Sequence, residues 1–163
     1  MKSCSRGLGF IAGIAIVSLS ALLGTEVHAS APRGQYQTAD DTVVDLKTRL
    51  SWQRGATSPK TLTDNSVSVT QYCEGLNLGG FSNGWRVPTR KELETLVDTS
   101  GEPWNAATID TSAFPNTAKS WFCTSTPVVG TNASWAVDFA LGGSCKAFPP
   151  NDKCWVRCVH SVE

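Results

Sequence analysis

Residues 72–98, YCEGLNLGGFSNGWRVPTRKELETLVD, carry the signals that decide the fold. They read in order as the end of a helix, a glycine-rich turn, a short strand around Trp85 and Arg86, and a second helix. Thr89 and Glu92 stand at the spacing of a capping box, in which each side chain accepts a hydrogen bond from the other residue's backbone N–H. The apolar residues that follow would form a buried face. We therefore predict a helix that starts directly after Thr89.

A first helix is predicted ahead of the glycine-rich turn. From Asp64 onward, apolar residues recur every three or four positions, which is the spacing of an amphipathic helix. These residues are Val69, Tyr72, Cys73 and Leu76. Asp64 is a suitable N-cap, and we expect Gly79 and Gly80 to end the helix.

The remaining signals are those of strands and long loops. Residues 42–45 and 50–53 are predicted to pair as a hairpin. Further strand-like runs lie at 120–125, 134–139 and 155–160, and the segments 54–62, 99–119 and 140–153 read as loops. Two helices packed on a small antiparallel sheet with long loops, and no internal repeat, indicate a single domain of the α+β class.

The first 29 residues are predicted to be a signal peptide. Lys2 and Arg6 form a basic start, residues 8–23 are an apolar run, and small residues precede a cleavage point before Ser30. The alternative is an uncleaved membrane anchor, but the run is shorter than the roughly 20 residues that a span needs. We expect an exported protein, periplasmic or extracellular, whose single domain comprises residues 30–163.

The charge of the cleaved chain narrows the class of partner. Of 14 basic and 14 acidic residues, Lys2, Arg6 and Glu26 would leave with the signal peptide. The remaining 12 and 13 give a net charge of −1, whereas nucleic-acid or anionic-membrane binding requires a basic excess. We expect neither partner, and no membrane span in the cleaved chain.

Five cysteines would remain in the cleaved chain, which predicts two disulfides and one further thiol in an oxidising compartment. Cys73 on the first helix and Cys158 on the last strand would join helix to sheet. Cys145 and Cys154 could close the loop before the last strand and leave Cys123 unpaired. A bond between Cys123 and Cys145 is the main alternative.

Several motifs in register resemble the Lcl C-terminal domain family of secreted bacterial proteins. They are TVVDLKTRLSWQR at 42–54, YCEGLNLGG at 72–80, WRVPTRKELETLVD at 85–98, IDTSAFPN at 109–116, SWFCTSTP at 120–127, WAVDFALGG at 135–143 and WVRCVH at 155–160. The resemblance implies a C-type-lectin-like fold, and the pair Cys73–Cys158 is similar to the framework bridge of such domains. Arg49 replaces a frequent glycine, and Cys123 stands where tryptophan or serine is usual.

Catalytic signals are sparse. His160 would be the single histidine of the cleaved chain, and no Ser/His/Asp or Cys/His arrangement can be assembled around it. Glu92, Glu94 and Asp98 read as a solvated helix face. An oxidative role for Cys123 or for the pair Cys154 and Cys158 would resemble formylglycine-generating enzymes, which share the C-type-lectin-like core.

Oxygen-bearing residues in two loops form the candidate binding site. They are Glu102 and Asn105, with Trp104 between them, and Asn151 with Asp152. Such oxygen ligands suit calcium, and Trp104 could stack on a sugar ring. No other cofactor is expected. Arg86 and Arg157 are expected to hold carbonyls or a carboxylate structurally.

These observations predict an exported binding or surface module that recognises a glycan or a protein partner at the cell envelope. Recognition would use the loops 99–119, 126–133 and 140–153, because loops on a rigid sheet commonly carry binding residues. The alternatives are a thiol-dependent oxidative enzyme and a structural envelope protein without a soluble ligand. The sequence leaves the oligomeric state open.

Overall fold

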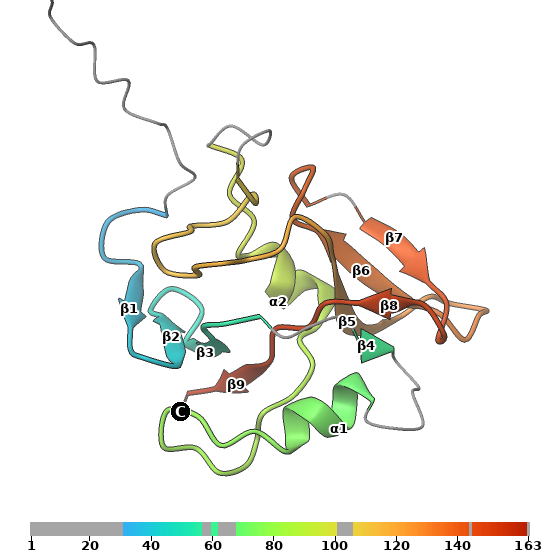
Figure 1. Ribbon diagram of the computed structural model, residues 1–163, viewed down its shortest axis with the longest axis horizontal. Coiled ribbons are helices and arrows are strands. Elements are labelled where there is room, and N and C mark those ends of the chain that lie inside the picture. Colours follow the sequence, from blue (N-terminus) through green and yellow to red (C-terminus); the bar gives the residue numbers. More distant parts are fainter. Residues whose placement is uncertain (1–30, 57–59, 62–67, 101–105, 144, 163) are drawn as a thin grey trace, which may run out of the picture.

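The computed structural model describes residues 31–56, 60–61, 68–100, 106–143 and 145–162. Within these residues the fold is α+β, with two short helices and antiparallel sheets (Figure 1). The elements are β1 (Tyr36–Thr38), β2 (Thr42–Asp45), β3 (Leu50–Gln53), β4 (Lys60–Thr61), α1 (Val69–Glu74), α2 (Arg90–Glu94), β5 (Trp121–Pro127), β6 (Ser134–Asp138), β7 (Cys145–Phe148), β8 (Lys153–Cys154) and β9 (Val159–Ser161).

The strands form three small sheets where the sequence predicted one. Their orders are β1-β2-β3-β9, β4-β8 and β5-β6-β7. The predicted hairpin of β2 and β3 is confirmed with its bounds, and Arg49 turns it with a positive φ of 56°. Strand β9 pairs with β3 through Trp52 and Val159, so the C-terminal end of the chain lies against its first hairpin (Figure 1).

The predicted strand 155–160 is wrong over its first half. Trp155 makes a single parallel bridge to Phe122, and regular pairing begins only at Val159. The side chains of Val156, Arg157 and Cys158 are all fully buried. Because successive side chains of an extended chain point to opposite sides, the burial of all three means that neighbouring elements cover both sides of this segment. The chain therefore passes between the sheets here.

The predicted loop 140–153 contains strand β7 and the first residue of β8. Strand β7 pairs with β6 in register from Val137 opposite Cys145 to Ser134 opposite Phe148. It lies at the edge of its sheet, and both Lys146 and Ala147 are exposed. An edge strand with polar and small residues shows little of the apolar alternation by which strands are predicted.

The capping box of α2 is confirmed, whereas the limits predicted for α1 are wrong. Thr89 accepts a hydrogen bond from the N–H of Glu92, whose carboxylate accepts one from the N–H of Thr89. Helix α1 begins after Ser68, which forms a capping box with Gln71, and ends at Gly75. Asp64 lies outside the described residues. Apolar periodicity overestimated α1 because the apolar residues continue beyond the helix.

The core consists of two groups of buried side chains. The hairpin cluster gathers around β2, β3, β9, α2 and the segment 107–114, with Trp52, Leu93 and Phe114 fully buried. The disulfide cluster gathers around α1, Trp85, Val87, Ala136, Phe148 and Val156. All four bridged cysteines belong to the disulfide cluster.

Two disulfides link elements that are distant in sequence. The expected bond between Cys73 and Cys158 is present and ties α1 to the segment before β9. The second joins Cys123 to Cys154, so the predicted pair Cys145–Cys154 is wrong, and so is an unpaired Cys123. The parallel bridge at Phe122 and Trp155 brings Cys123 and Cys154 to a Cα–Cα distance of 5.5 Å.

Candidate binding site

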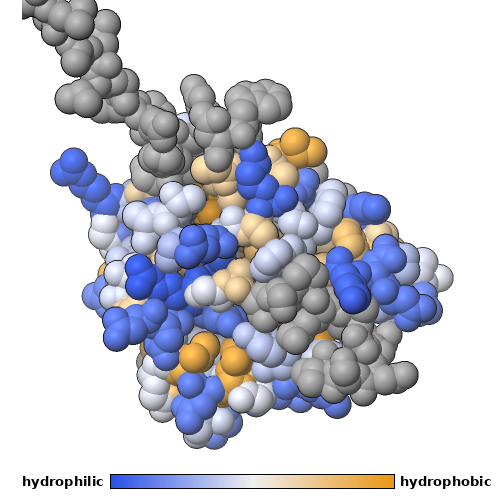
Figure 2. Space-filling view, in the orientation of Figure 1, coloured by the Kyte–Doolittle hydropathy of each residue, from blue (hydrophilic) through white to orange (hydrophobic). Residues whose placement is uncertain are grey.

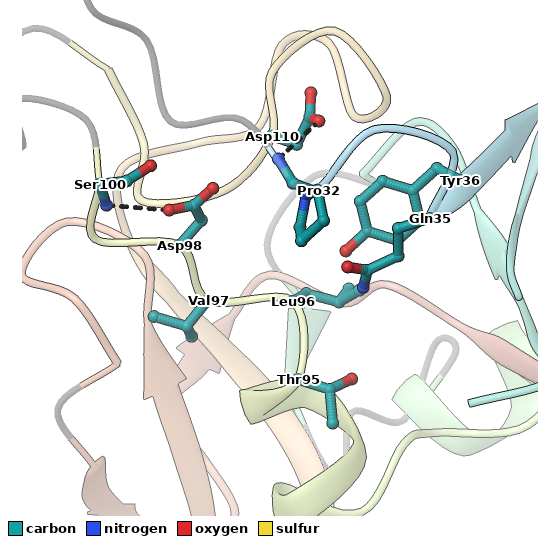
Figure 3. Close-up of a pocket in the computed structure, with 10 residues that line it drawn as sticks. Pro32, Gln35, Tyr36, Thr95, Leu96, Val97, Asp98, Ser100 and Asp110 are labelled. Atoms are coloured by element: carbon teal, nitrogen blue, oxygen red, sulfur yellow. Dashed lines mark hydrogen bonds between the residues drawn. The ribbon is translucent and has the colours of Figure 1, made fainter. Parts of the chain in front are cut away.

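A cavity of about 270 Å³ lies where the N-terminal segment passes the end of α2 (Figure 3). Its walls come from three stretches: residues 31–36, residues 95–100 and Asp110. Asp98 and Ser100 lie on one side of Pro32, and Gln35 and Tyr36 lie on the other (Figure 3). The lining residues are Ala31, Pro32, Gln35, Tyr36, Thr95, Leu96, Val97, Asp98, Ser100 and Asp110.

Asp110 is the most deeply placed carboxylate of this pocket, with 8% of its surface exposed. One oxygen accepts hydrogen bonds from Ser112 N–H, Ser112 Oγ–H and Ala113 N–H, and the other accepts from Ala31 N–H at 3.0 Å. Burial by itself would raise the pKa of Asp110, but these hydrogen bonds lower it below its ordinary value. The carboxylate therefore stays charged, and its hydrogen-bond donors are neutral.

Asp98 follows the last turn of α2 and is half-buried. Its backbone N–H donates to Thr108 O at 3.0 Å, and Thr108 N–H donates to Phe139 O at 2.8 Å. Its carboxylate accepts from Ser100 N–H at 2.8 Å through one oxygen, and the other oxygen points towards Pro32 (Figure 3). The backbone bonds fix Asp98 while leaving a carboxylate oxygen directed at the cavity.

Tyr36 closes the opposite side. Its ring stands edge-on to Phe114 at 5.3 Å between centroids. Burial, followed by the nearby carboxylates of Asp45, Asp110 and Asp98, raises the pKa of its hydroxyl. The phenol therefore stays protonated and can donate a hydrogen bond.

The loops predicted to bind a ligand lie at opposite ends of the β5-β6-β7 sheet. The turn 139–143 lies at the pocket end: a Cβ added to Gly142 would lie 2.9 Å from the methyl of Thr99, and one added to Gly143 would lie 3.1 Å from Val97. The hairpin 128–133 and the turn 149–152 lie at the other end, where Pro127, Ser134 and Phe148 are in register. The described parts of the three loops therefore do not form one surface.

The five predicted binding residues do not form one described site. Glu102, Trp104 and Asn105 lie outside the described residues, so their part in a binding site stays a prediction. Asn151 and Asp152 are exposed in the turn between β7 and β8. Within the described ranges, no three His, Cys, Asp or Glu side chains are grouped so as to hold a metal ion. Calcium binding by the predicted set stays a prediction.

Sequence reasoning missed the lining residues of the pocket. Residues 31–36 carry none of the signals used in the sequence analysis, yet this stretch contributes Gln35, Tyr36 and the start of the first strand. Asp98 was read as part of a solvated helix face, whereas it lies beyond the end of α2. The order Asp-x-Ser-Ala at 110–113 is a usable signal, because Asp followed two residues later by Ser is typical of a carboxylate that caps a turn.

The other charged side chains singled out in the sequence have structural partners. Arg86 forms a two-point ion pair with Glu92, at 2.9 and 2.7 Å. Arg90 pairs with Glu94 at 2.8 Å. The fully buried Arg157 donates to Gln53 O, Arg54 O and Thr117 Oγ1 at 2.6 to 2.9 Å. The structural roles expected for Arg86 and Arg157 are confirmed.

Comparison with protein families gives a match to the Lcl C-terminal domain over residues 41–160. The matched range covers most of the chain and includes all the motifs on which the family resemblance was based. Comparisons with curated proteins and with solved structures give no match.

Proposed function

Because the chain belongs to the Lcl C-terminal domain family, we propose that it is an exported binding module that recognises a glycan at the bacterial cell envelope. A secreted surface module fits the family and the two disulfides, which form in oxidising compartments. A C-type-lectin-like arrangement and cleavage before Ser30 remain part of the proposal. Among the described residues, no helix has the length and apolar character to cross a membrane.

The observation that carries the proposal is the composition of the pocket. It combines apolar surface at Pro32 and Val97 with carboxylate, amide, phenol and hydroxyl groups. Sugar-binding sites need both kinds of group, since a sugar ring has apolar C–H faces and a rim of hydroxyls that donate and accept hydrogen bonds. At about 270 Å³ the cavity lies near the lower limit of about 300 Å³ for small-ligand sites.

A protein partner receives less support from the surface. Large exposed apolar side chains among the described residues are Val129, Leu141 and Leu46, on three separate turns. The face in Figure 2 is predominantly hydrophilic, with orange side chains in small separate spots. Docking surfaces for proteins usually present a contiguous apolar patch.

A thiol-dependent enzyme also receives less support. Cys154 and Cys158 bond to different partners, so CWVRC does not form a redox pair. The four bridged cysteines are at most 1% exposed. Buried disulfides are poorly accessible to an attacking thiolate, which is the behaviour of structural bridges.

The test is binding of oxidised residues 30–163 to an array of neutral, amino and sulfated glycans, with calcium and with chelator. Gln35→Trp fills the pocket with a large side chain and should abolish binding. Asn151→Trp places the same side chain in an exposed turn at the other end of the sheet and should leave binding intact. Thermal unfolding of both variants checks that they fold.

Selective binding that is lost with Gln35→Trp supports the proposal. If only Asn151→Trp abolishes glycan binding, the site lies at the opposite end of the sheet. If chelator abolishes glycan binding, the calcium prediction is supported. A wild-type domain that binds no glycan in either condition would refute glycan recognition.

A further inference from the structure

We propose that the pocket between the N-terminal segment and the end of α2 takes an amine-bearing sugar, a cationic amino sugar, in preference to neutral, acidic or sulfated ones. This inference rests on the proposed glycan-binding function and specifies its ligand class. It is carried by three properties of the pocket: its charge, its hydrogen-bonding groups and its shape.

The charge of the described pocket lining is negative. Asp98 and Asp110 both line the pocket, and none of the described lining residues is Lys, Arg or His. The donors to Asp110 are backbone N–H groups and the Ser112 hydroxyl, and the Asp98 carboxylate accepts a hydrogen bond from the Ser100 N–H. These donors stabilise the carboxylates without cancelling their charge, so a cationic group would bind favourably and a sulfate would be repelled.

The surrounding groups reinforce this sign. Asp45 faces the Tyr36 side from β2, where it pairs with Tyr36 across the sheet, and the side chain of Asp45 is fully buried. Arg157 is the cation that acts on Tyr36 from the core. Its hydrogen bonds to Gln53 O, Arg54 O and Thr117 Oγ1 leave its charge in place, but the carboxylates of Asp45, Asp98 and Asp110 outnumber it. An ammonium group in the cavity would therefore be close to more negative than positive charge.

The hydrogen-bonding groups favour a sugar over a simple alkyl amine. Gln35 offers an amide, Tyr36 a phenol, and Thr95 and Ser100 hydroxyls, at different points around the cavity. A lysine side chain presents one polar end on an alkyl stem and would leave most of these groups to water. A sugar ring carries several hydroxyls in addition to its amine and can engage more of them.

The shape agrees with a single ring. The apolar surfaces of Pro32 and Val97 lie beside Leu96, which is almost fully buried (Figure 3). The Tyr36 ring borders the same space, and an aromatic face attracts a cation within about 6 Å. One sugar ring could pack its apolar face on this surface while its amine remains near Asp98.

The experiment uses a matched pair of ligands, glucosamine oligomers and N-acetylglucosamine oligomers of equal length. They differ only in whether the nitrogen carries a charge or an acetyl group. Titration calorimetry with the oxidised domain should show at least about tenfold tighter binding of the glucosamine oligomer, weakening as salt is raised. A heparin-type sulfated oligomer should not compete.

Asp98→Asn removes one charge at nearly constant volume, and its amide oxygen can still accept the Ser100 N–H bond. We expect about tenfold weaker binding of the glucosamine oligomer with unchanged thermal unfolding. Glu74→Gln is the matched control, because it makes the same carboxylate-to-amide change at an exposed position on α1, outside the pocket. It should bind as the wild type does.

Equal affinity for the two oligomers, or full affinity in Asp98→Asn, would overturn the inference and leave glycan recognition standing. A lysine-rich peptide that displaces the oligomer at equal charge concentration would overturn the assignment to sugars. If the array of the previous section is blank as well, the proposed function itself fails, so the two failures can be told apart.

Discussion

The hairpin cluster and the disulfide cluster are held together by different interactions. Both disulfides lie in the disulfide cluster, where they tie α1 and β5 to the C-terminal segment. The hairpin cluster contains no bridged cysteine among its described members and is joined to that segment by Arg157. The guanidinium lies over the Phe114 ring at 4.5 Å and donates to main-chain carbonyls of residues 53 and 54.

This difference bears on the candidate site, because the pocket borders the hairpin cluster. Leu96 belongs to that cluster, and Tyr36 and Val97 pack against it. The pocket is thus positioned by hydrogen bonds and packing, whereas the covalent bonds secure the other half. Conditions that weaken hydrogen bonds should therefore destabilise the hairpin cluster and its pocket before they destabilise the disulfide cluster.

Removal of the longest bridge should produce the largest effect. In Cys73→Ser with Cys158→Ser, the chain loses a closure over 85 residues. The chain-entropy treatment predicts a loss of about 4.5 kcal/mol in the free energy of unfolding. Urea unfolding followed by tryptophan fluorescence measures it. A loss below about 1 kcal/mol would show that packing and the remaining Cys123–Cys154 bond are enough to hold the disulfide cluster.

Replacement of Arg157 should have the next largest effect, on the other cluster. Burial lowers the pKa of Arg157 to about 9, so it remains charged at neutral pH. Arg157→Met would leave two carbonyls and the Thr117 hydroxyl without their donor, at a cost of about 3 kcal/mol. Arg157→Lys keeps the charge and should lose less, by the same urea measurement.

If Arg157→Met were as stable as the wild type, Arg157 would not be what stabilises the hairpin cluster. This result would mean that desolvation of the guanidinium offsets its hydrogen bonds, as can occur for buried charges. The hairpin cluster would then be held by apolar packing alone.

The smallest effect concerns pH and the start of α2. The hydrogen bonds from Arg86, assisted by Thr89 and opposed by burial, lower the pKa of Glu92 from the usual 4.5 to about 2. Because the folded pKa is the lower one, this stabilisation is complete above about pH 4.5 and is lost as the pH falls towards about 2. The side chain of Arg86 is 40% exposed, so solvent screening limits the loss to about 1 kcal/mol.

Unfolding of the wild type and of Glu92→Gln at several pH values across this window checks the expectation. The difference in stability between the two proteins should shrink as the pH falls. A constant difference would assign the effect of Glu92 to helix capping alone.

Local signals were sufficient wherever a few adjacent residues decide the conformation. The capping box at Thr89 and Glu92, the ion pair available to Arg86 next to it, and the hairpin at 42–53 depend on neighbours within about ten residues. The bond between Cys73 and Cys158 could also be anticipated, because Cys73 lies on the apolar stripe of a predicted helix. Family motifs over most of the chain gave the class of domain.

Contacts between distant segments could not be anticipated in the same way. The partner of Cys154 depends on a bridge between Phe122 and Trp155, and β7 exists because β6 offers it an edge. Asp98 and Asp110 become one pocket because the N-terminal segment crosses the end of α2. None of these three contacts leaves a periodic pattern in the sequence.

The sequence alone therefore determined the family, the class of fold, the second helix, the first hairpin and one disulfide, because capping, alternation and motif spacing act over short distances along the chain. Folding of the whole chain establishes the three-sheet arrangement, the second disulfide, the burial of Arg157 and the pocket. Each of these depends on which segments come to lie side by side, such as Cys123 and Cys154 at a separation of 31 residues or Gln53 and Arg157 at 104, and that is set by packing of the whole core.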